Sequence, residues 1–118
     1  MSTHLKRPGE PTTKDCPMRA AMSAIGGKWS LIVLYWLEGA PQRFNQLQRL
    51  VPDISHKVLA EVLRTLEDEG LITRATHEAH VAYAITAHGR SVRPLIDAIH
   101  DWGCAHLGVK AAPSRSAE

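Results

Sequence analysis

The segment from Ser55 to Gly70, SHKVLAEVLRTLEDEG, separates apolar from polar positions with a helical period. Ser55 is a favourable helix N-cap, and Gly70 is a favourable residue just past a helix end. At about 100° per residue, apolar and charged side chains fall on opposite sides. The apolar stripe holds Val58, Leu59, Val62, Leu63 and Leu66, and the other side holds Lys57, Ala60, Glu61, Arg64 and Asp68. The pattern predicts a helix with one face in a core and the other toward solvent.

Two helices are predicted before this one. Cys16-Pro17 opens a helix that runs to about Ile25, with the proline at the first helical position. Gly26-Gly27 then breaks the chain, and residues 28–38 (KWSLIVLYWLE) are apolar on nearly every side. A helix of this kind is normally buried, so we expect the second helix to be the central one.

The chain then predicts a helix-turn-helix. Residues 42–44 fit a short strand, after which Asn45 can cap a third helix that extends to about Leu50. Pro52-Asp53-Ile54 forms the turn into the helix that starts at Ser55. In a helix-turn-helix, the helix after the turn, which here is the one that starts at Ser55, typically enters the major groove of DNA.

Beyond Gly70, residues 71–76 and 81–85 predict two strands joined by residues 77–80, a hairpin of the kind called a wing. Thr86 is expected to cap a long last helix from Ala87 to about Leu107, kinked early by Pro94. The predicted fold is therefore mainly α with a small β-hairpin, a winged helix-turn-helix. We place this domain at residues 16–107, between a flexible arm (1–15) and a flexible tail (108–118).

The last helix carries an apolar stripe that the small domain cannot cover by itself. Its members are Val92, Leu95, Ile96, Ile99 and Trp102. An apolar stripe of this length is unfavourable in water, so we expect it to pair with a second copy of the chain in a homodimer.

Composition narrows the range of partners only slightly. The chain has 118 residues and a formal charge of +2, and residues 19–107 hold nine Lys or Arg against nine Asp or Glu. Attraction to DNA would have to come from a local cluster of basic groups. No apolar run approaches the about 18 residues of a membrane span, and no signal-peptide pattern opens the chain, so we expect a cytoplasmic protein that does not enter a membrane.

The sequence does not indicate an enzyme, a metal site or a cofactor. His77-Glu78-Ala79-His80 lacks the two-residue spacer of the zinc-protease helix motif, and no glycine-rich phosphate loop follows a strand. Cys16 lies at a predicted helix N-terminus near Lys14 and Arg19, which can activate a thiol, whereas Asp15 acts in the opposite direction. An inert packed cysteine and a reactive one are both open.

The DNA-facing candidates are the outer side of the Ser55–Gly70 helix together with the short strand and the hairpin tip. They are Arg43, Ser55, His56, Lys57, Glu61, Arg64, His77 and His80. Basic groups would meet phosphates or a guanine edge, and Glu61 can accept a hydrogen bond from a cytosine amino group. Two other interpretations are a plain solvated helix and a winged-helix module that binds proteins and never DNA.

Taken in order, the sequence motifs resemble the HxlR family of winged helix-turn-helix regulators. They are Cys-Pro at 16–17, Ile-Gly-Gly-Lys-Trp at 25–29, Arg-Phe-Asn at 43–45, Ile-Ser at 54–55, Gly-Leu-Ile-Thr-Arg at 70–74 and Tyr-Ala-Ile-Thr at 83–86. The resemblance extends from about Cys16 to Gly103. It departs at the hairpin, which is shorter than usual and lacks the arginine that the family carries there, and at Glu61, where the family often has a neutral or basic residue.

This resemblance implies a homodimeric transcription factor, commonly a repressor, that binds an inverted-repeat operator. Similar proteins include thiol sensors that use a cysteine at the position of Cys16. The resemblance therefore implies a small electrophile or an oxidant as a possible effector, acting at Cys16. It assigns no role to Cys104.

Overall fold

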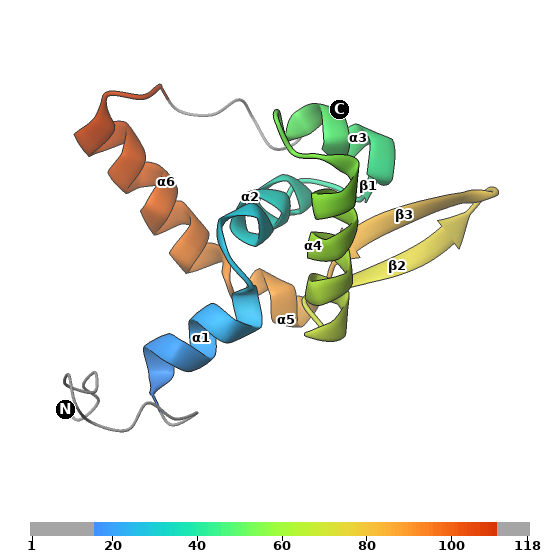
Figure 1. The fold of residues 1–118 in the computed structure, drawn as a ribbon, viewed down its shortest axis with the longest axis horizontal. Helices are drawn as coiled ribbons and strands as arrows, with labels where there is room; N and C mark the ends of the chain where they lie inside the picture. Colours follow the sequence, from blue (N-terminus) through green and yellow to red (C-terminus); the bar gives the residue numbers. More distant parts are fainter. Residues whose placement is uncertain (1–15, 111–118) are drawn as a thin grey trace.

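The computed structural model describes residues 16–110, which form six helices and three short strands (Figure 1). The elements in chain order are α1 (Pro17–Ile25), α2 (Lys28–Leu37), β1 (Gln42–Arg43), α3 (Phe44–Leu50), α4 (His56–Asp68), β2 (Ile72–His77), β3 (His80–Ile85), α5 (Ala87–Arg90) and α6 (Arg93–Leu107). The predicted fold class, mainly α with a small antiparallel sheet, is confirmed. The predicted arm, residues 1–15, and most of the predicted tail lie outside the described residues.

The core forms around α2, as the apolar composition of that helix predicts. Val33, Leu34 and Leu37 of α2 are buried. The inner face of α4 packs against them through Leu59, Leu63 and Leu66. Each of these side chains removes apolar area from water, at about 1.5–3 kcal/mol for a fully buried leucine or valine. Packing of α4 on α2 therefore fixes which side of α4 faces outward.

The sheet has the strand order β1-β3-β2, and both pairings are antiparallel. β2 and β3 pair from Ile72↔Ile85 to His77↔His80, so the hairpin loop has two residues and not the four expected. Glu78 and Ala79 form this turn with φ of 52° and 68°. Two consecutive residues with positive φ match the twist of a tight hairpin, which explains how the pairing extends to His77 and His80.

The expected long last helix is two helices. Thr86 does cap the first: its Oγ1 accepts a hydrogen bond from the Gly89 N–H at 2.9 Å. However, α5 ends at Arg90, and α6 begins at Arg93 with Pro94 in its first turn. A proline at 94 cannot donate to the carbonyl of residue 90 and its ring collides with that carbonyl, so the helix breaks there instead of bending.

The expected cap of α3 is also wrong by two residues. The helix begins at Phe44, and Arg43 is its N-cap residue, so Asn45 lies inside the first turn. The Gln46 side chain accepts a hydrogen bond from the Arg43 N–H at 2.8 Å. This contact satisfies the backbone N–H of Arg43, as in a capping box. The helix therefore starts at Phe44 without an asparagine at its N-cap.

Among the described residues, no single helix is long and apolar enough to cross a membrane. Only α1 and α2 taken together reach that length and hydropathy, and the chain bends by 66° between them. Much of the apolar surface of α2 is instead buried in the core.

Candidate nucleic-acid interface

The outer face of α4 presents charged side chains to solvent. Lys57, Glu61, Arg64 and Asp68 are all exposed, and we call these four residues the α4 outer face. Ser55 caps the helix, because its Oγ accepts a hydrogen bond from the Val58 N–H at 3.1 Å. The capped N-terminus, with its remaining free amides, favours an anion such as a phosphate. The amphipathic pattern in the sequence is therefore confirmed in space.

His56, the first residue of α4, is held in place by an aromatic neighbour. Its ring lies 4.6 Å from the ring of Phe44, centroid to centroid, at an interplanar angle of 44°. Phe44 begins α3, so this contact joins the starts of the two helices of the helix-turn-helix. Arg43, the residue before Phe44, is exposed at the end of β1. Because the N-termini of α3 and α4 are in contact, Arg43, His56 and Lys57 lie in one region.

A polar depression of about 360 Å³ lies between α4 and the sheet, and it contains two residues that the sequence analysis did not single out. Arg64 of α4 lines it together with Arg74 of β2 and Tyr83 of β3. Arg74 Nε lies 3.7 Å from a carboxylate oxygen of Glu67, and the Arg74 side chain is more than half exposed. Arg74 and Tyr83 are directly opposite on neighbouring strands. The lining therefore combines two guanidinium groups and a phenol with the carboxylates of Glu67 and Asp68.

Strand alternation could have identified Arg74 from the sequence. It is two residues from the buried Ile72, so both point to the same face of β2, the face that packs toward α4. The sequence motif Gly-Leu-Ile-Thr-Arg contains this arginine but does not by itself indicate a role for it.

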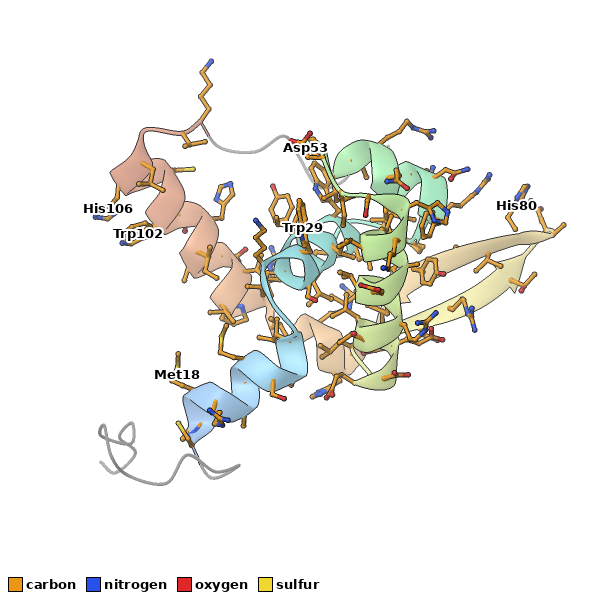
Figure 2. All side chains as sticks on the ribbon, in the orientation of Figure 1. Met18, Trp29, Asp53, His80, Trp102 and His106 are labelled. Carbon is orange, nitrogen blue, oxygen red and sulfur yellow. The ribbon has the colours of Figure 1, made fainter. Side chains whose placement is uncertain are left out.

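The wing extends away from the helical body, and His80 lies near its tip (Figure 2). His80 is exposed, as is Val81 beside it. For His77 the structure gives the backbone position only, the last pair of the ladder opposite His80. The described part of the wing beyond Arg74 contains no Lys or Arg.

Cys16 is the N-cap residue of α1, as expected, and it makes no capping hydrogen bond with its side chain. Only 8% of the residue is exposed. In Figure 1 the start of α1 lies on the opposite side of the molecule from the wing. Cys16 is therefore not part of the α4 outer face. A change at Cys16 would reach the α4 outer face through α1.

The apolar stripe expected on the last helix is divided by the structure. Ile96 is only 4% exposed and Val92 is half-buried, and both pack against the core of their own domain. Leu95, Ile99 and Trp102 are 41%, 50% and 56% exposed. We call these three residues the α6 apolar face. Met18 and Met22 of α1 are also exposed, and Figure 2 shows Met18 on the same side of the molecule as Trp102.

Within residues 16–110, no group of three or more His, Cys, Asp or Glu side chains is arranged to hold a metal ion. Three of the described histidines, His56, His100 and His106, make ring contacts. Examples are the stack of His106 on Trp102, with centroids 5.0 Å apart, and the contact of His56 with Phe44.

Comparison with known proteins places these features in a family. The profile of the HxlR-like helix-turn-helix family matches residues 24–111. An HTH-type transcriptional regulator of Methanothermobacter thermautotrophicus is 38% identical over 91 residues, which cover 75% of this chain and 70% of that protein.

The fold is also similar to solved structures of two regulators. The redox regulator HypR in its oxidized form superposes with a TM-score of 0.74 at 32% identity, over 77% of this chain and 97% of HypR. Quinone-bound YodB from Bacillus subtilis superposes with a TM-score of 0.65 at 30% identity, over 76% of this chain and 99% of YodB.

Proposed function

Because this chain belongs to the HxlR-like helix-turn-helix family, whose relatives include transcriptional regulators, we propose that it regulates transcription by binding double-stranded DNA as a homodimer. The observation that carries the proposal is the α4 outer face. Lys57 and Arg64 project from a capped helix whose other side is locked in the core. A helix held in this way can enter a major groove without losing core contacts.

Each candidate residue has a role that follows from its position. Lys57 and His56, at the start of α4, would meet a phosphate or a guanine edge. Arg64, two turns further along, would reach a base or, with Arg74, a phosphate at the depression beside the sheet. Glu61 lies between them on the exposed side and would accept from a cytosine amino group. Arg43 would contact the backbone, and the wing histidines would lie beside the adjacent groove.

Two copies of α4 are needed to bind an inverted repeat. We propose that the α6 apolar face, with Met18 and Met22 of α1, pairs two protomers. The two α4 helices would then enter successive major grooves about 34 Å apart, as in other helix-turn-helix dimers. Bound over a promoter, such a dimer would act as a repressor.

The test is the salt dependence of binding to the DNA that flanks the protein's own gene. If phosphate contacts dominate, log affinity falls linearly with log salt concentration. Arg64→Ala should cost about 1–3 kcal/mol if Arg64 reads a base, with specificity relaxed at that base pair. Arg19→Ala, on the exposed side of α1, is the matched control and should leave affinity unchanged. Binding with no steep salt slope would indicate the protein-interaction module instead.

We further propose that oxidation or alkylation of Cys16 changes DNA affinity. Support comes from the structural similarity to HypR, solved in an oxidized form, and to YodB, solved with a bound quinone. Cys16 is buried at the start of α1, so an added group would have to displace α1 from its packing. Because α1 contributes to the proposed dimer contact, the separation of the two α4 helices would change. Operator affinity that is unchanged after complete alkylation of Cys16 contradicts this part of the proposal; Cys16→Ser treated in parallel is the control.

A further inference from the structure

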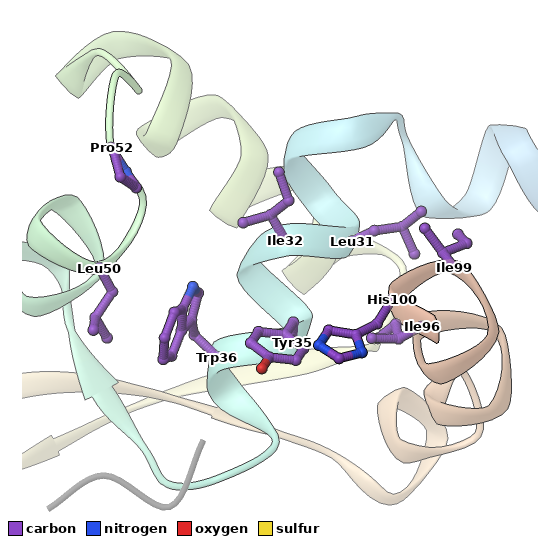
Figure 3. Close-up of a pocket in the computed structure, with 9 residues that line it drawn as sticks. All are labelled: Leu31, Ile32, Tyr35, Trp36, Leu50, Pro52, Ile96, Ile99 and His100. Carbon is purple, nitrogen blue, oxygen red and sulfur yellow. The ribbon is translucent and has the colours of Figure 1, made fainter. Parts of the chain in front are cut away.

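An apolar cavity of about 330 Å³, open to solvent on one side, lies between α2, α6 and the connection from α3 to α4 (Figure 3). Its aliphatic lining includes Ile32 of α2, Leu50 at the end of α3 and Ile99 of α6. Its volume is at the lower end of the range of about 300–1,000 Å³ found for small-molecule sites. A cavity of this size suits a ligand of one or two fused rings.

One wall of the cavity is a row of aromatic rings. Tyr35 stacks on His100 of α6, with centroids 5.9 Å apart and planes 11° from parallel. Trp36 meets Tyr35 edge to face, with centroids at 5.2 Å and planes at 83°. Figure 3 shows the three rings side by side, with Leu50 beyond Trp36. Such mutual contacts hold the rings in place, so the wall is formed before any ligand arrives.

The cavity carries no formal charge of its own. None of the described residues that line it is Lys, Arg, Asp or Glu. Its polar side-chain groups are the Tyr35 hydroxyl, the Trp36 indole and the His100 imidazole, which all lie along the aromatic wall. A charged ligand would lose its hydration there without gaining an opposite charge, which is costly. The complementary ligand is flat, uncharged and mostly apolar.

The cavity and the α6 apolar face overlap at one residue, Ile99. At about 100° per residue, Ile96 and His100 lie on the side of α6 that faces α2, whereas Leu95 and Trp102 lie on the adjacent outer side. Only Ile99, between these two sides, belongs to both sets. A second protomer seated on the α6 apolar face would contact Ile99 and so border the mouth of the cavity.

We propose that this cavity binds a flat, uncharged aromatic compound between the aromatic wall and the aliphatic side chains of Ile32, Leu50 and Ile99. The ligand would contact α6 on one side and the Leu50–Pro52 segment, which leads into α4, on the other. Occupancy would thus set the position of α6 relative to α4. The consequence for DNA affinity rests on the proposed function, whereas the binding itself does not.

The experiment uses the full chain and two probes of the same shape, 2-naphthol, which is uncharged, and 2-naphthoate, which is an anion. Calorimetric titration should show one 2-naphthol bound per protomer. Binding of 2-naphthoate should be at least about tenfold weaker, because the cavity offers no cationic side chain of Lys or Arg. Neither probe is an electrophile, so modification of Cys16 does not enter the result.

Two variants fill the cavity from different sides, Leu50→Trp and Ile99→Trp. Each should weaken 2-naphthol binding at least about tenfold, or about 1.4 kcal/mol. Val81→Trp, on the exposed side of the wing, is the matched control and should change the affinity by less than about twofold. Far-UV circular dichroism establishes that each variant is folded, and Ile99→Trp, at a half-exposed position, retains the test if Leu50→Trp does not fold.

Three results would overturn the proposal: no binding of 2-naphthol to the folded protein, equal binding by the cavity variants and the control, or a cavity filled by the second protomer. In the last case 2-naphthol would not bind, and Leu50→Trp would change the oligomeric state. DNA binding measured on the same samples separates the two proposals. Intact, salt-dependent DNA binding without 2-naphthol binding would overturn only the cavity.

Discussion

Gly89 lies in α5, where the backbone of this short helix passes the carbonyl of Leu71. A Cβ atom at this position would overlap the Leu71 carbonyl oxygen and would lie 2.7 Å from Cγ1 of Ile85. Both neighbours are held by the sheet and the core, so neither can move away easily. We therefore expect Gly89→Ala to destabilise the fold by about 3 kcal/mol, the upper part of the range for overpacking.

The matched control for Gly89 is Gly103→Ala in α6. A Cβ there would meet no atom within 4 Å. Alanine at an open helical position should stabilise by about 0.5–1 kcal/mol. Urea denaturation of the two variants beside the wild type measures both effects, and Gly89→Ala of wild-type stability would contradict the packing described for α5.

Glu67 and Arg74 form an ion pair at the edge of the proposed DNA-binding surface. In the free protein Glu67 partly neutralises Arg74, at 3.7 Å. On DNA a phosphate would compete for the same guanidinium. Arg74→Ala should weaken binding uniformly across sequences and lower the salt slope by about 1. Glu67→Gln should strengthen binding by about 2–5-fold, the range of a weak surface pair.

Asp101→Asn is the control for Glu67→Gln, because it removes one exposed negative charge from α6, away from α4. If both substitutions raise the DNA affinity equally, the gain comes from net charge and not from release of Arg74. Titrations at several salt concentrations distinguish the two outcomes.

At the residue scale, the sequence predicts the position of a side chain that depends on one helix alone. It does not predict which side chains come together from two different elements. Ser55 and Arg64 follow from the period of α4 alone. Arg74 and Tyr83 join Arg64 only because β2 and β3 pack beside α4. Likewise the stripe on the last helix could not show that Ile96 turns into its own core, since that depends on where α2 lies.

Among the elements, α2 is joined to the α5–α6 region by a buried carboxylate. The Glu38 side chain is 3% exposed, and its Oε1 lies 3.9 Å from an Nη1 atom of both Arg90 and Arg93. Its other oxygen is buried and has no hydrogen-bond partner among the described residues. A carboxylate in this position depends on the two arginines for compensation of its charge.

This dependence predicts a non-additive pair of substitutions. Arg90→Ala and Arg93→Ala should each cost less than about 1 kcal/mol, because each guanidinium is more than half exposed and the other remains. The double variant should lose about 2–3 kcal/mol, more than the sum, because Glu38 is then buried without a counter-charge. Chemical denaturation of all four proteins gives the coupling energy.

The control for this cycle combines Arg93→Ala with Arg19→Ala. Arg19 is exposed on α1, and the ion pairs of Glu38 are with Arg90 and Arg93. These two substitutions should be additive. Additivity of Arg90→Ala with Arg93→Ala as well would mean that the arginines do not share the Glu38 carboxylate.

Element identities follow from the sequence more readily than element boundaries do. Every predicted helix and strand exists, because each depends on a local period or a local breaker. The hairpin is longer than expected because Glu78 and Ala79, neither of them glycine, adopt positive φ in the turn. The last helix breaks because the effect of Pro94 is stronger than the continuous apolar pattern around it.

At the scale of the whole molecule, the described chain has two sides of different chemistry. The α4 outer face and the wing lie on one side, and α1 and α6 extend on the other (Figure 1). Exposed apolar side chains are concentrated on α1 and α6, whereas the α4 outer face is charged. Pairing through α1 and α6 would therefore leave both α4 helices free to face one DNA duplex.

This arrangement predicts that a charge on the α6 apolar face dissociates the dimer. Trp102→Glu should produce a monomer, because burying an unpaired carboxylate in an apolar interface is unfavourable. Sedimentation velocity measures the change. Val81→Glu, an exposed apolar position on the wing, should leave the oligomeric state unchanged. Loss of the dimer should weaken operator binding by at least about 100-fold, since the second half-site no longer adds to the first.

The most direct test of the account is a hydroxyl-radical footprint of the wild type and of Arg64→Ala on the DNA that flanks the gene. We predict two protected half-sites, with centres about 10–10.5 base pairs or a multiple of that apart, as two major-groove helices require. Protection should weaken in both half-sites together in the Arg64→Ala variant and persist with Arg19→Ala. Absence of protection at low salt, or a footprint that Arg64→Ala leaves unchanged, would contradict the assignment of α4 as the DNA-reading helix.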